Sequence, residues 1–411
     1  MANFDYGIIG GGPAGYTVAM LLAKQGASVV LFEKDQLGGT CLNRGCIPTK
    51  SLLHNSEMYA NSIKNLLELG IDIDKNEIDI NKIFAKKDFA VEKIRKSLEL
   101  AVKNSGVKIV YAQANILNKQ EIEAKEEIYS VNKIILATGS KPRKLKGFEY
   151  DGDFIINSDD LLKMDKLPKS ILIVGSGAIG IEWARIFNNF DVEVILVEMA
   201  EHLLPLADVD VSKRVERIFK QQKISYFLKD FIEVINDKKV LLHSGKEFEV
   251  EKVLIAIGRE PLEKNIEGID ILGDICGEIQ LAHYAISQAK EYALNLKLKK
   301  NLVPSVVYGE PEIAWVGLRE QDCDDSYTKI QMPITALGKS WCDECTDGFI
   351  KFIIKDNLIY GAHIVSKEAS SMIHTVLLAI QNQITINDLQ KTCFAHPTYS
   401  EGIADLLSKC D

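Results

Sequence analysis

Two cysteines with reactive surroundings stand out in the segment GGTCLNRGCIPTK, residues 38–50. Cys41 and Cys46 lie five positions apart between glycines, with Lys50 just after them. Such a pair can be a structural clip, half of a metal site or a redox couple. On an ideal helix, residues at this spacing have Cα atoms roughly 8 to 9 Å apart, whereas a disulfide tolerates at most about 7 Å. A bridge therefore requires a break in the helix, which Gly45 permits.

Redox chemistry explains this pair better than metal binding does. Zinc would need two further ligands, and no CxxC or HxxxH lies nearby in a comparable glycine-rich setting. Lys50 and the N-terminus of a helix that begins near Pro48 would both stabilise a thiolate on Cys46. A chain of 411 residues buries ample core without disulfides. We therefore expect no metal here, and an oxidised Cys41–Cys46 pair would be catalytic rather than structural.

A second pair of residues that could take part in catalysis lies in AHPTYSEG, residues 395–402. His396 and Glu401 are five positions apart, with Pro397 between them. A carboxylate that holds one imidazole nitrogen leaves the other free as a base and raises the pKa of the ring, which suits proton exchange with a thiol. Taken alone, such a spacing more often marks a surface contact than a catalytic dyad, so the residues themselves leave the role open.

The elements that must position these groups form an internal repeat of two nucleotide folds. The segments YGIIGGGPAGYTVAMLLAKQGASVVLFEK and ILIVGSGAIGIEWARIFNNFDVEVILVEM share one pattern, in which glycines follow an apolar strand and an acid ends the next strand. The three glycines allow a tight turn, close approach to a pyrophosphate and close helix packing, and the helix N-terminus favours the phosphate charge. These residues are Gly10, Gly12, Gly15 and Glu33 in the first copy, and Gly175, Gly177, Gly180 and Glu198 in the second.

The acids and the remaining strand ends bear on which dinucleotides bind. A carboxylate in the position of Glu198 hydrogen-bonds ribose hydroxyls and repels a 2′-phosphate, and no arginine follows it in MAEH, so NAD is favoured over NADP. The acid Glu33 does not by itself show which dinucleotide the first site binds. Asp274 follows a later short strand, where it can hold a ribose or ribityl hydroxyl or simply form a turn. Two further strands, KIILATGSKP and KVLIAIGREP, add Thr138, Gly139 and Gly258 to the expected cofactor-binding residues.

Composition excludes several other classes of function. A formal net charge of -9 gives no basic footprint for nucleic acid. No apolar run approaches the roughly 18 residues of a membrane span. The N-terminal residues show no basic region followed by a long apolar stretch, so we expect a cytoplasmic protein.

The segment GGTCLNRGCIPTK resembles the active-site signature of class I pyridine nucleotide-disulfide oxidoreductases, and its Cys-Ile-Pro form is more similar to lipoamide dehydrogenases than to glutathione reductases. The resemblance spans nearly the whole chain, including VPSVVYGEPEIAWVGL, residues 303–318, and AHPTYSEG. It implies FAD in the first nucleotide fold and NAD in the second. Glu33 would then bind the FAD ribose, Asp274 would lie near the ribityl chain, and Lys50 and Glu182 would form an ion pair beside the flavin.

The resemblance also implies an architecture: an α/β chain with two Rossmann-like dinucleotide-binding domains and a C-terminal α+β dimerisation domain. The expected divisions are an FAD domain at 1–146, an NAD domain at 147–268, a shortened return to the FAD domain at 269–301 and a dimerisation domain at 302–411. In such homodimers His396 and Glu401 come from the partner subunit.

The implied activity is the reoxidation of dihydrolipoamide, with Cys41 facing the substrate, Cys46 facing FAD, and NAD+ receiving the hydride. The partners would be lipoyl domains of 2-oxoacid dehydrogenase complexes or of a glycine-cleavage system. Alternatives are a reductase of another small disulfide or of mercuric ion, and a flavin-binding protein whose turnover is impaired by the short 262–270 connector. Cys342 and Cys345 form a CxxC that we interpret as incidental, and Cys410 lacks the paired cysteine of mercuric reductases.

Overall fold

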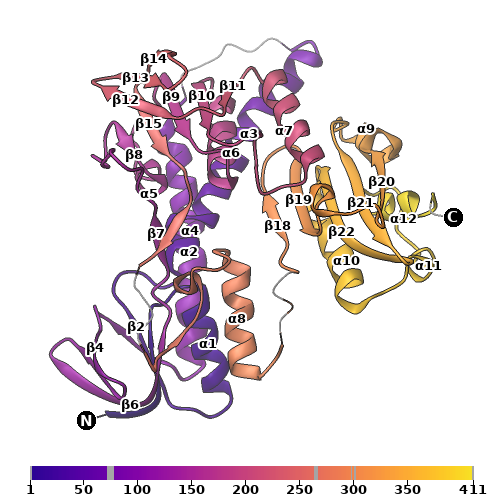
Figure 1. Ribbon diagram of the computed structural model, residues 1–411. Coiled ribbons are helices and arrows are strands. Elements are labelled where there is room, and N and C mark those ends of the chain that lie inside the picture. Colours follow the sequence, from indigo (N-terminus) through magenta and orange to yellow (C-terminus); the bar gives the residue numbers. More distant parts are fainter. Residues whose placement is uncertain (1, 72–77, 263–266, 298, 300–301, 410–411) are drawn as a thin grey trace.

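The computed structural model describes residues 2–71, 78–262, 267–297, 299 and 302–409, and it falls into three parts (Figure 1). The first nucleotide fold lies at the bottom of the view, the second at the top, and a C-terminal part lies to the right. Helices α3 and α4 run between the two nucleotide folds. The fold class expected from the sequence is confirmed.

The first nucleotide fold is built on a mostly parallel sheet with the order β3-β2-β1-β6-β5-β4, and β17 pairs with β6. The central strand β2, VVLFE, is buried along its whole length because apolar clusters cover both faces of the sheet there. The strands are β1 (Ala2–Ile9), β2 (Val29–Glu33), β3 (Lys108–Tyr111), β4 (Asn115–Asn118), β5 (Glu121–Ala124), β6 (Glu127–Leu136) and β17 (Asp270–Ile271). The helices around it are α1 (Pro13–Lys24), α2 (Gly39–Arg44), α3 (Cys46–Glu68), α4 (Ile80–Asn104), η1 (Asp274–Cys276) and α8 (Ala282–Leu294).

The second nucleotide fold repeats this plan with the parallel order β11-β10-β9-β15-β8. A small antiparallel sheet, β12-β13-β14, covers one face. Its elements are β8 (Ile155–Ile156), α5 (Ser158–Leu161), β9 (Ser170–Val174), α6 (Ala178–Asn189), β10 (Glu193–Glu198), α7 (Val209–Gln221), β11 (Ser225–Leu228), β12 (Ile232–Asn236), β13 (Lys239–Leu242), β14 (Glu247–Glu249) and β15 (Lys252–Ile255). The chain enters this fold through β7 (Ser140–Pro142) and leaves it through β16 (Arg259–Pro261), which pair antiparallel.

The C-terminal part is an antiparallel sheet, β18-β19-β22-β21-β20, with α10 packed against it. Its elements are β18 (Ser305–Val307), β19 (Glu312–Gly317), η2 (Glu320–Asp322), β20 (Thr328–Pro333), η3 (Ile334–Ala336), α9 (Gly338–Cys342), β21 (Phe349–Lys355), β22 (Leu358–Ser366), α10 (Ala369–Asn382), α11 (Ile386–Leu389) and α12 (Glu401–Leu407). One hydrophobic cluster joins Leu52 of α3, Ile186 of α6 and Phe349 of β21. The site-bearing helices are therefore packed against all three parts.

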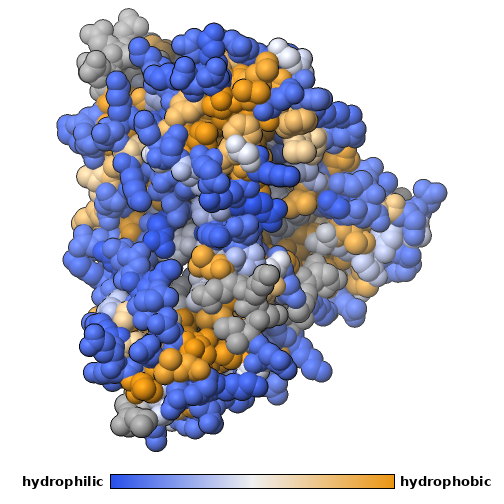
Figure 2. Space-filling view, turned by 60° about the vertical axis from the view of Figure 1, so that its left-hand side comes forward, coloured by the Kyte–Doolittle hydropathy of each residue, from blue (hydrophilic) through white to orange (hydrophobic). Residues whose placement is uncertain are grey.

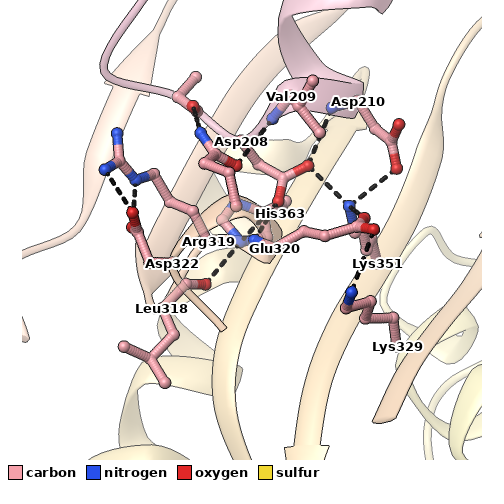
Figure 3. Close-up of polar contacts among 12 residues, drawn as sticks. Asp208, Val209, Asp210, Leu318, Arg319, Glu320, Asp322, Lys329, Lys351 and His363 are labelled. Carbon is pink, nitrogen blue, oxygen red and sulfur yellow. Dashed lines mark hydrogen bonds and ion pairs between the residues drawn. The ribbon is translucent and has the colours of Figure 1, made fainter. Parts of the chain in front are cut away.

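A buried lysine fastens the second fold to the C-terminal part (Figure 3). Lys351 of β21 is only 2% exposed, and its Nζ contacts Asp208 at 2.7 Å, Asp210 at 2.8 Å and Glu320. The three carboxylates lie close enough together to hold a metal ion. The Lys351 ammonium group contacts all three, and Lys213 and Lys329 pair with Asp210 and Glu320, so the cluster is an ion-pair network.

We expect Lys351→Met to destabilise the protein by about 3 kcal/mol, because it leaves the buried Asp208 carboxylate without its counterion. Chemical denaturation of purified protein would measure the change. The matched control is Lys239→Met, which removes an exposed lysine paired with Glu247 at 3.3 Å and should change little. Equal stabilities of the two variants would contradict the assigned role of the network.

The surface carries hydrophobic side chains in separate patches within a mostly hydrophilic face (Figure 2). Exposed examples on α4 are Phe89, Ile94 and Leu100. Among the described residues, no helix is both long enough and apolar enough to cross a membrane.

Candidate functional site

The cysteine pair lies where two helices meet at a break in the backbone. Helix α2 ends at Arg44 and α3 begins at Cys46, and Gly45 between them has φ -145° and ψ -109°, outside helical geometry. The helix is therefore interrupted at Gly45, as the spacing requires. The thiols of Cys41 and Cys46 share a hydrogen bond. The two side chains therefore lie next to each other at the break in the helix.

The surroundings of Cys46 favour its thiolate. The hydrogen bond from Cys41 and the nearby Lys50 ammonium lower the pKa of Cys46 to about 7, against the opposing effect of burial. The first turn of α3 adds its unpaired backbone N–H groups and dipole. The same hydrogen bond and burial raise the pKa of Cys41. Cys46 is therefore the thiol that ionises first.

Lys50 is held in place by Glu182 of α6. Its Nζ lies 2.7 Å from the Glu182 carboxylate and over the ring of Tyr308, 4.7 Å from the centroid. The backbone N–H of Tyr308 donates to the same carboxylate at 3.1 Å. The ion pair expected from the family resemblance is thus present, and it joins α3 to α6 beside the cysteines.

We expect Lys50→Met to raise the pKa of Cys46 by at least about one unit, because a neighbouring cation is lost. In the wild-type dithiol, alkylation at Cys46 should slow as the pH falls through about 7, since only the thiolate reacts. In the variant this midpoint should move upward. Tandem mass spectrometry after timed iodoacetamide treatment measures each cysteine. The exposed Cys342 is the internal control, and an unshifted midpoint at Cys46 would contradict the electrostatic role of Lys50.

A cavity of about 750 Å³ runs from the first glycine loop to the cysteine pair. It lies at the carboxyl ends of the strands, where the order of the first sheet reverses at β1, which is where open α/β sheets bind ligands. Its volume falls within the range of cofactor and ligand pockets. The residues predicted from the sequence that line it are Gly10, Gly12, Glu33, Cys41, Cys46, Lys50, Thr138, Gly139, Glu182 and Asp274.

The glycine loops have the geometry that pyrophosphate binding demands. Gly10 has φ +107° and Gly175 has φ +97°, which L side chains rarely adopt. A Cβ on Gly15 would lie 1.8 Å from the Gly10 carbonyl oxygen, and one on Gly180 would lie 2.0 Å from that of Gly175. Gly177 has open space at its Cβ position. Each loop thus leaves backbone N–H groups at a helix N-terminus free to receive a phosphate.

The two acids hold their loops in the same way. Glu33 accepts from the N–H of Gly11 and of Asp35, both at 2.8 Å. Glu198 accepts from the N–H of Ser176 at 2.8 Å and of Ala200 at 2.9 Å. The repeat found in the sequence therefore extends to matched hydrogen bonds in three dimensions.

Further groups on the cavity wall are arranged for polar contact. Ser140 Oγ donates to Asp274 at 2.6 Å and accepts from Arg259 Nε at 2.8 Å. The buried Thr138 Oγ1 has no partner among the described residues, which suits a ligand hydroxyl or carbonyl. Gly258 has φ +94° and lies directly before Arg259. The residues on this wall thus fit a polar cofactor such as FAD.

His396 and Glu401 do interact, but one chain does not bring them to the cysteines. His396 Nδ1 lies 2.8 Å from Glu401 Oε2, and the imidazole is 77% exposed. Neither residue lines the cavity, and α12 lies at the far side of the C-terminal part (Figure 1). The exposed ring is available to a second molecule.

Sequence reasoning missed the contacts that cross between the parts of the chain. Ser140 and Arg259 were overlooked although they follow the predicted strands. Lys351 could have been found, because a lysine in the apolar strand FIKFIIK needs a partner of opposite charge.

The two cysteines of the CxxC do not line the cavity. Cys342 is exposed and Cys345 is buried, with burial raising the pKa of Cys345 to about 11. Cys410 and part of the 262–270 connector lie outside the described residues.

Comparisons with known proteins agree with this geometry. Residues 4–271 match the pyridine nucleotide-disulphide oxidoreductase family, and residues 303–407 match its dimerisation domain. The chain is 32% identical to a dihydrolipoyl dehydrogenase of Chlamydia pneumoniae, over 97% of this chain and 95% of the relative. It is 30% identical to one of Bacillus subtilis, over 100% of this chain and 98% of the relative.

A solved structure supports the fold. LpdA of Mycobacterium tuberculosis superimposes with a TM-score of 0.91 at 23% identity, covering 100% of this chain and 99% of that one. The two glycine loops, the interrupted helix with its cysteines and the matches along the chain lead to one conclusion: the chain belongs to the pyridine nucleotide-disulphide oxidoreductase family.

Proposed function

We propose that the protein is an NAD-dependent dihydrolipoyl dehydrogenase with FAD as its bound cofactor. The observation that carries this proposal is the Cys41–Cys46 thiol pair, which lines the large cavity beside the Lys50–Glu182 ion pair. Its full-length relatives at 30% identity or more carry this name. FAD, when bound in the cavity, would supply two-electron transfer between the dithiol and NAD+.

The thiol chemistry follows from which cysteine ionises first. A substrate thiolate attacks Cys41 Sγ of the oxidised pair, a mixed disulfide forms, and Cys46 leaves as a thiolate. Cys46 is the better leaving group because its pKa is the lower of the two. The second substrate thiol then attacks the mixed disulfide, which releases the cyclic disulfide product and the Cys41 thiol. His396, oriented by Glu401, takes the proton of the first substrate thiol, and the proton of the second substrate thiol passes to the Cys41 sulfur as that sulfur leaves the mixed disulfide.

The second site would hold NAD, with Glu198 on its adenosine ribose. We expect Glu198→Ala to reduce the preference for NAD+ over NADP+ by about tenfold to a hundredfold, because it removes a charge-assisted hydrogen bond and the repulsion of a 2′-phosphate. The ratio of kcat/KM values for the two nucleotides measures this. Glu193→Ala, an exposed acid at the start of β10, is the control. An unchanged ratio for Glu198→Ala would contradict the assignment.

The dimerisation domain and the exposed imidazole support a homodimer in which each chain completes the other's site. We propose domain limits of 1–146 with 269–301 for FAD, 147–268 for NAD and 302–411 for dimerisation. Strand β17 and helix α8 support the return of 269–301 to the first fold. Lipoyl domains of a 2-oxoacid dehydrogenase complex or glycine-cleavage system would be the partners, in the cytoplasm.

Anaerobic titration of the purified, flavin-loaded protein with dihydrolipoamide, followed by NAD+, tests the proposal. We expect a long-wavelength thiolate-to-flavin absorption band and then NADH formation. Glutathione disulfide with NADPH is the comparison for the alternative reductase activity. A flavin-containing protein that gives neither the band nor NADH would overturn the dehydrogenase proposal.

A further inference from the structure

A second cavity, of about 260 Å³, lies apart from the cysteine site. Its walls come from helices α3, α6 and α7, from Glu310 and Pro311 before β19, and from residues 344–347 before β21. None of the cysteine-site residues lines it. Lys64, with a side chain that is 60% exposed, is part of the wall, so the cavity opens to solvent on that side. The three parts of the chain meet here.

Arg185 offers the cavity an unused hydrogen-bonding edge. The residue is 2% exposed, and its Nη1 donates to the Pro311 carbonyl oxygen at 2.8 Å. Its Nε and Nη2 atoms have no partner among the described residues. These two donors share one edge of the guanidinium plane, which matches the two oxygens of a carboxylate. Because buried donors are costly when unpaired, this edge is suited to receive a carboxylate.

Hydrogen-bond acceptors on the same walls require a ligand that donates hydrogen bonds. Glu57 Oε1 and Gln222 Oε1 are buried and without partners among the described residues. Burial and the nearby Glu310 raise the pKa of Glu57 to about 7, against the opposing effect of the Arg185 charge. Glu310 accepts one hydrogen bond, from Asn61 at 2.7 Å.

The charges on the walls decide the class of ligand. Four acidic side chains face two basic ones; the acids are Glu57, Glu310, Glu344 and Asp347, and the bases are Lys64 and Arg185. Asp347 is already paired with Arg214. A simple anion on Arg185 would be repelled by the remaining acids, whereas a ligand that also carries a positive donor group satisfies both sets.

We propose that this cavity binds a small zwitterionic amino acid, with its carboxylate on the Nε/Nη2 edge of Arg185 and its ammonium group facing Glu57 and Gln222. The volume exceeds the roughly 30 Å³ share of a single water several times over, and therefore admits a ligand of this class. The site is independent of the nucleotide sites and of the proposed activity.

Isothermal titration calorimetry of the full-length, flavin-loaded protein tests the proposal with glycine, L-alanine and L-serine as probes. The controls are acetate, which carries only the carboxylate of the zwitterion, and methylammonium, which carries only its ammonium group. At least one amino acid should bind, and each half should bind about tenfold or more weakly, because one set of charged hydrogen bonds is missing. Arg185→Lys should weaken amino-acid binding about tenfold or more, since lysine cannot form the bidentate contact.

A second variant separates binding from folding. Glu57→Gln has the same shape and should weaken amino-acid binding without weakening acetate. Glu68→Gln makes the same change at an exposed position on α3 that does not line the cavity, and should leave binding unaltered. The proposal is overturned if none of the three amino acids binds, if acetate binds as tightly as they do, or if Glu57→Gln leaves their affinity unchanged. If Arg185→Lys does not fold, Glu57→Gln decides the question.

Discussion

Replacing either cysteine with serine should reduce dihydrolipoamide oxidation at least about a thousandfold, because the two sulfur atoms act as one unit, while the two variants should differ in colour. Cys41→Ser keeps the Cys46 thiolate beside the cavity and a hydroxyl in place of its hydrogen-bond donor. We therefore expect a permanent long-wavelength band at pH above about 7. Cys46→Ser removes the ionising thiol and should show no band.

Absorption spectra of the flavin-loaded variants, recorded without substrate, measure this difference. Cys342→Ser, which changes an exposed thiol on α9 outside the cavity, is the matched control and should retain full turnover. A band in Cys46→Ser and none in Cys41→Ser would show that the roles of the two sulfurs are exchanged.

Loss of the His396 imidazole should lower turnover about a hundredfold to ten thousandfold, the usual contribution of a general base. The position of this ring suggests a sharper experiment. His396 is exposed and outside the cavity in its own chain, so in the proposed homodimer the site would be completed by residues from two chains. His396→Gln and Cys46→Ser protomers carry defects in different halves of that site.

Reassociation of equal amounts of the two inactive variants should therefore restore activity. Half of the dimers would be mixed, and in each mixed dimer one site would have both defects and the other none. About a quarter of wild-type activity is expected from this symmetry. Mixing His396→Gln with Glu401→Gln, whose defects lie in the same half, is the control and should restore none. No recovery in the first mixture, despite dimers of mixed composition by mass spectrometry, would show that His396 acts within its own chain.

The sequence was most informative where backbone geometry dictates residue type. The requirement for glycine at Gly10 and Gly175 arises from left-handed backbone and from carbonyl oxygens that exclude a side chain. The break at Gly45 could likewise be deduced, because helical spacing and disulfide geometry are incompatible. These constraints act within a few residues, so they can be recognised in a single sequence.

Contacts between distant segments were not predictable in this way. Arg185 lies on α6, whose apolar residues predict a buried helix face, but nothing nearby identifies Pro311 as its partner. Lys351 signals that a counterion exists without saying that Asp208 provides it, 143 positions earlier. Such pairings depend on how whole domains pack, and local propensity carries no information about that.

The discontinuity of the first nucleotide fold has a consequence for biosynthesis. Its glycine loop is made at the start of the chain, but strand β17 and Asp274, which complete the sheet and the cavity wall, follow only after the whole second fold. Because ribosomes add residues from the N-terminus at about 5 to 20 per second, the second fold can close first, as a continuous unit. A nascent chain must therefore hold its first sheet unfinished for many seconds, and loading of the flavin is expected to be among the last events of maturation.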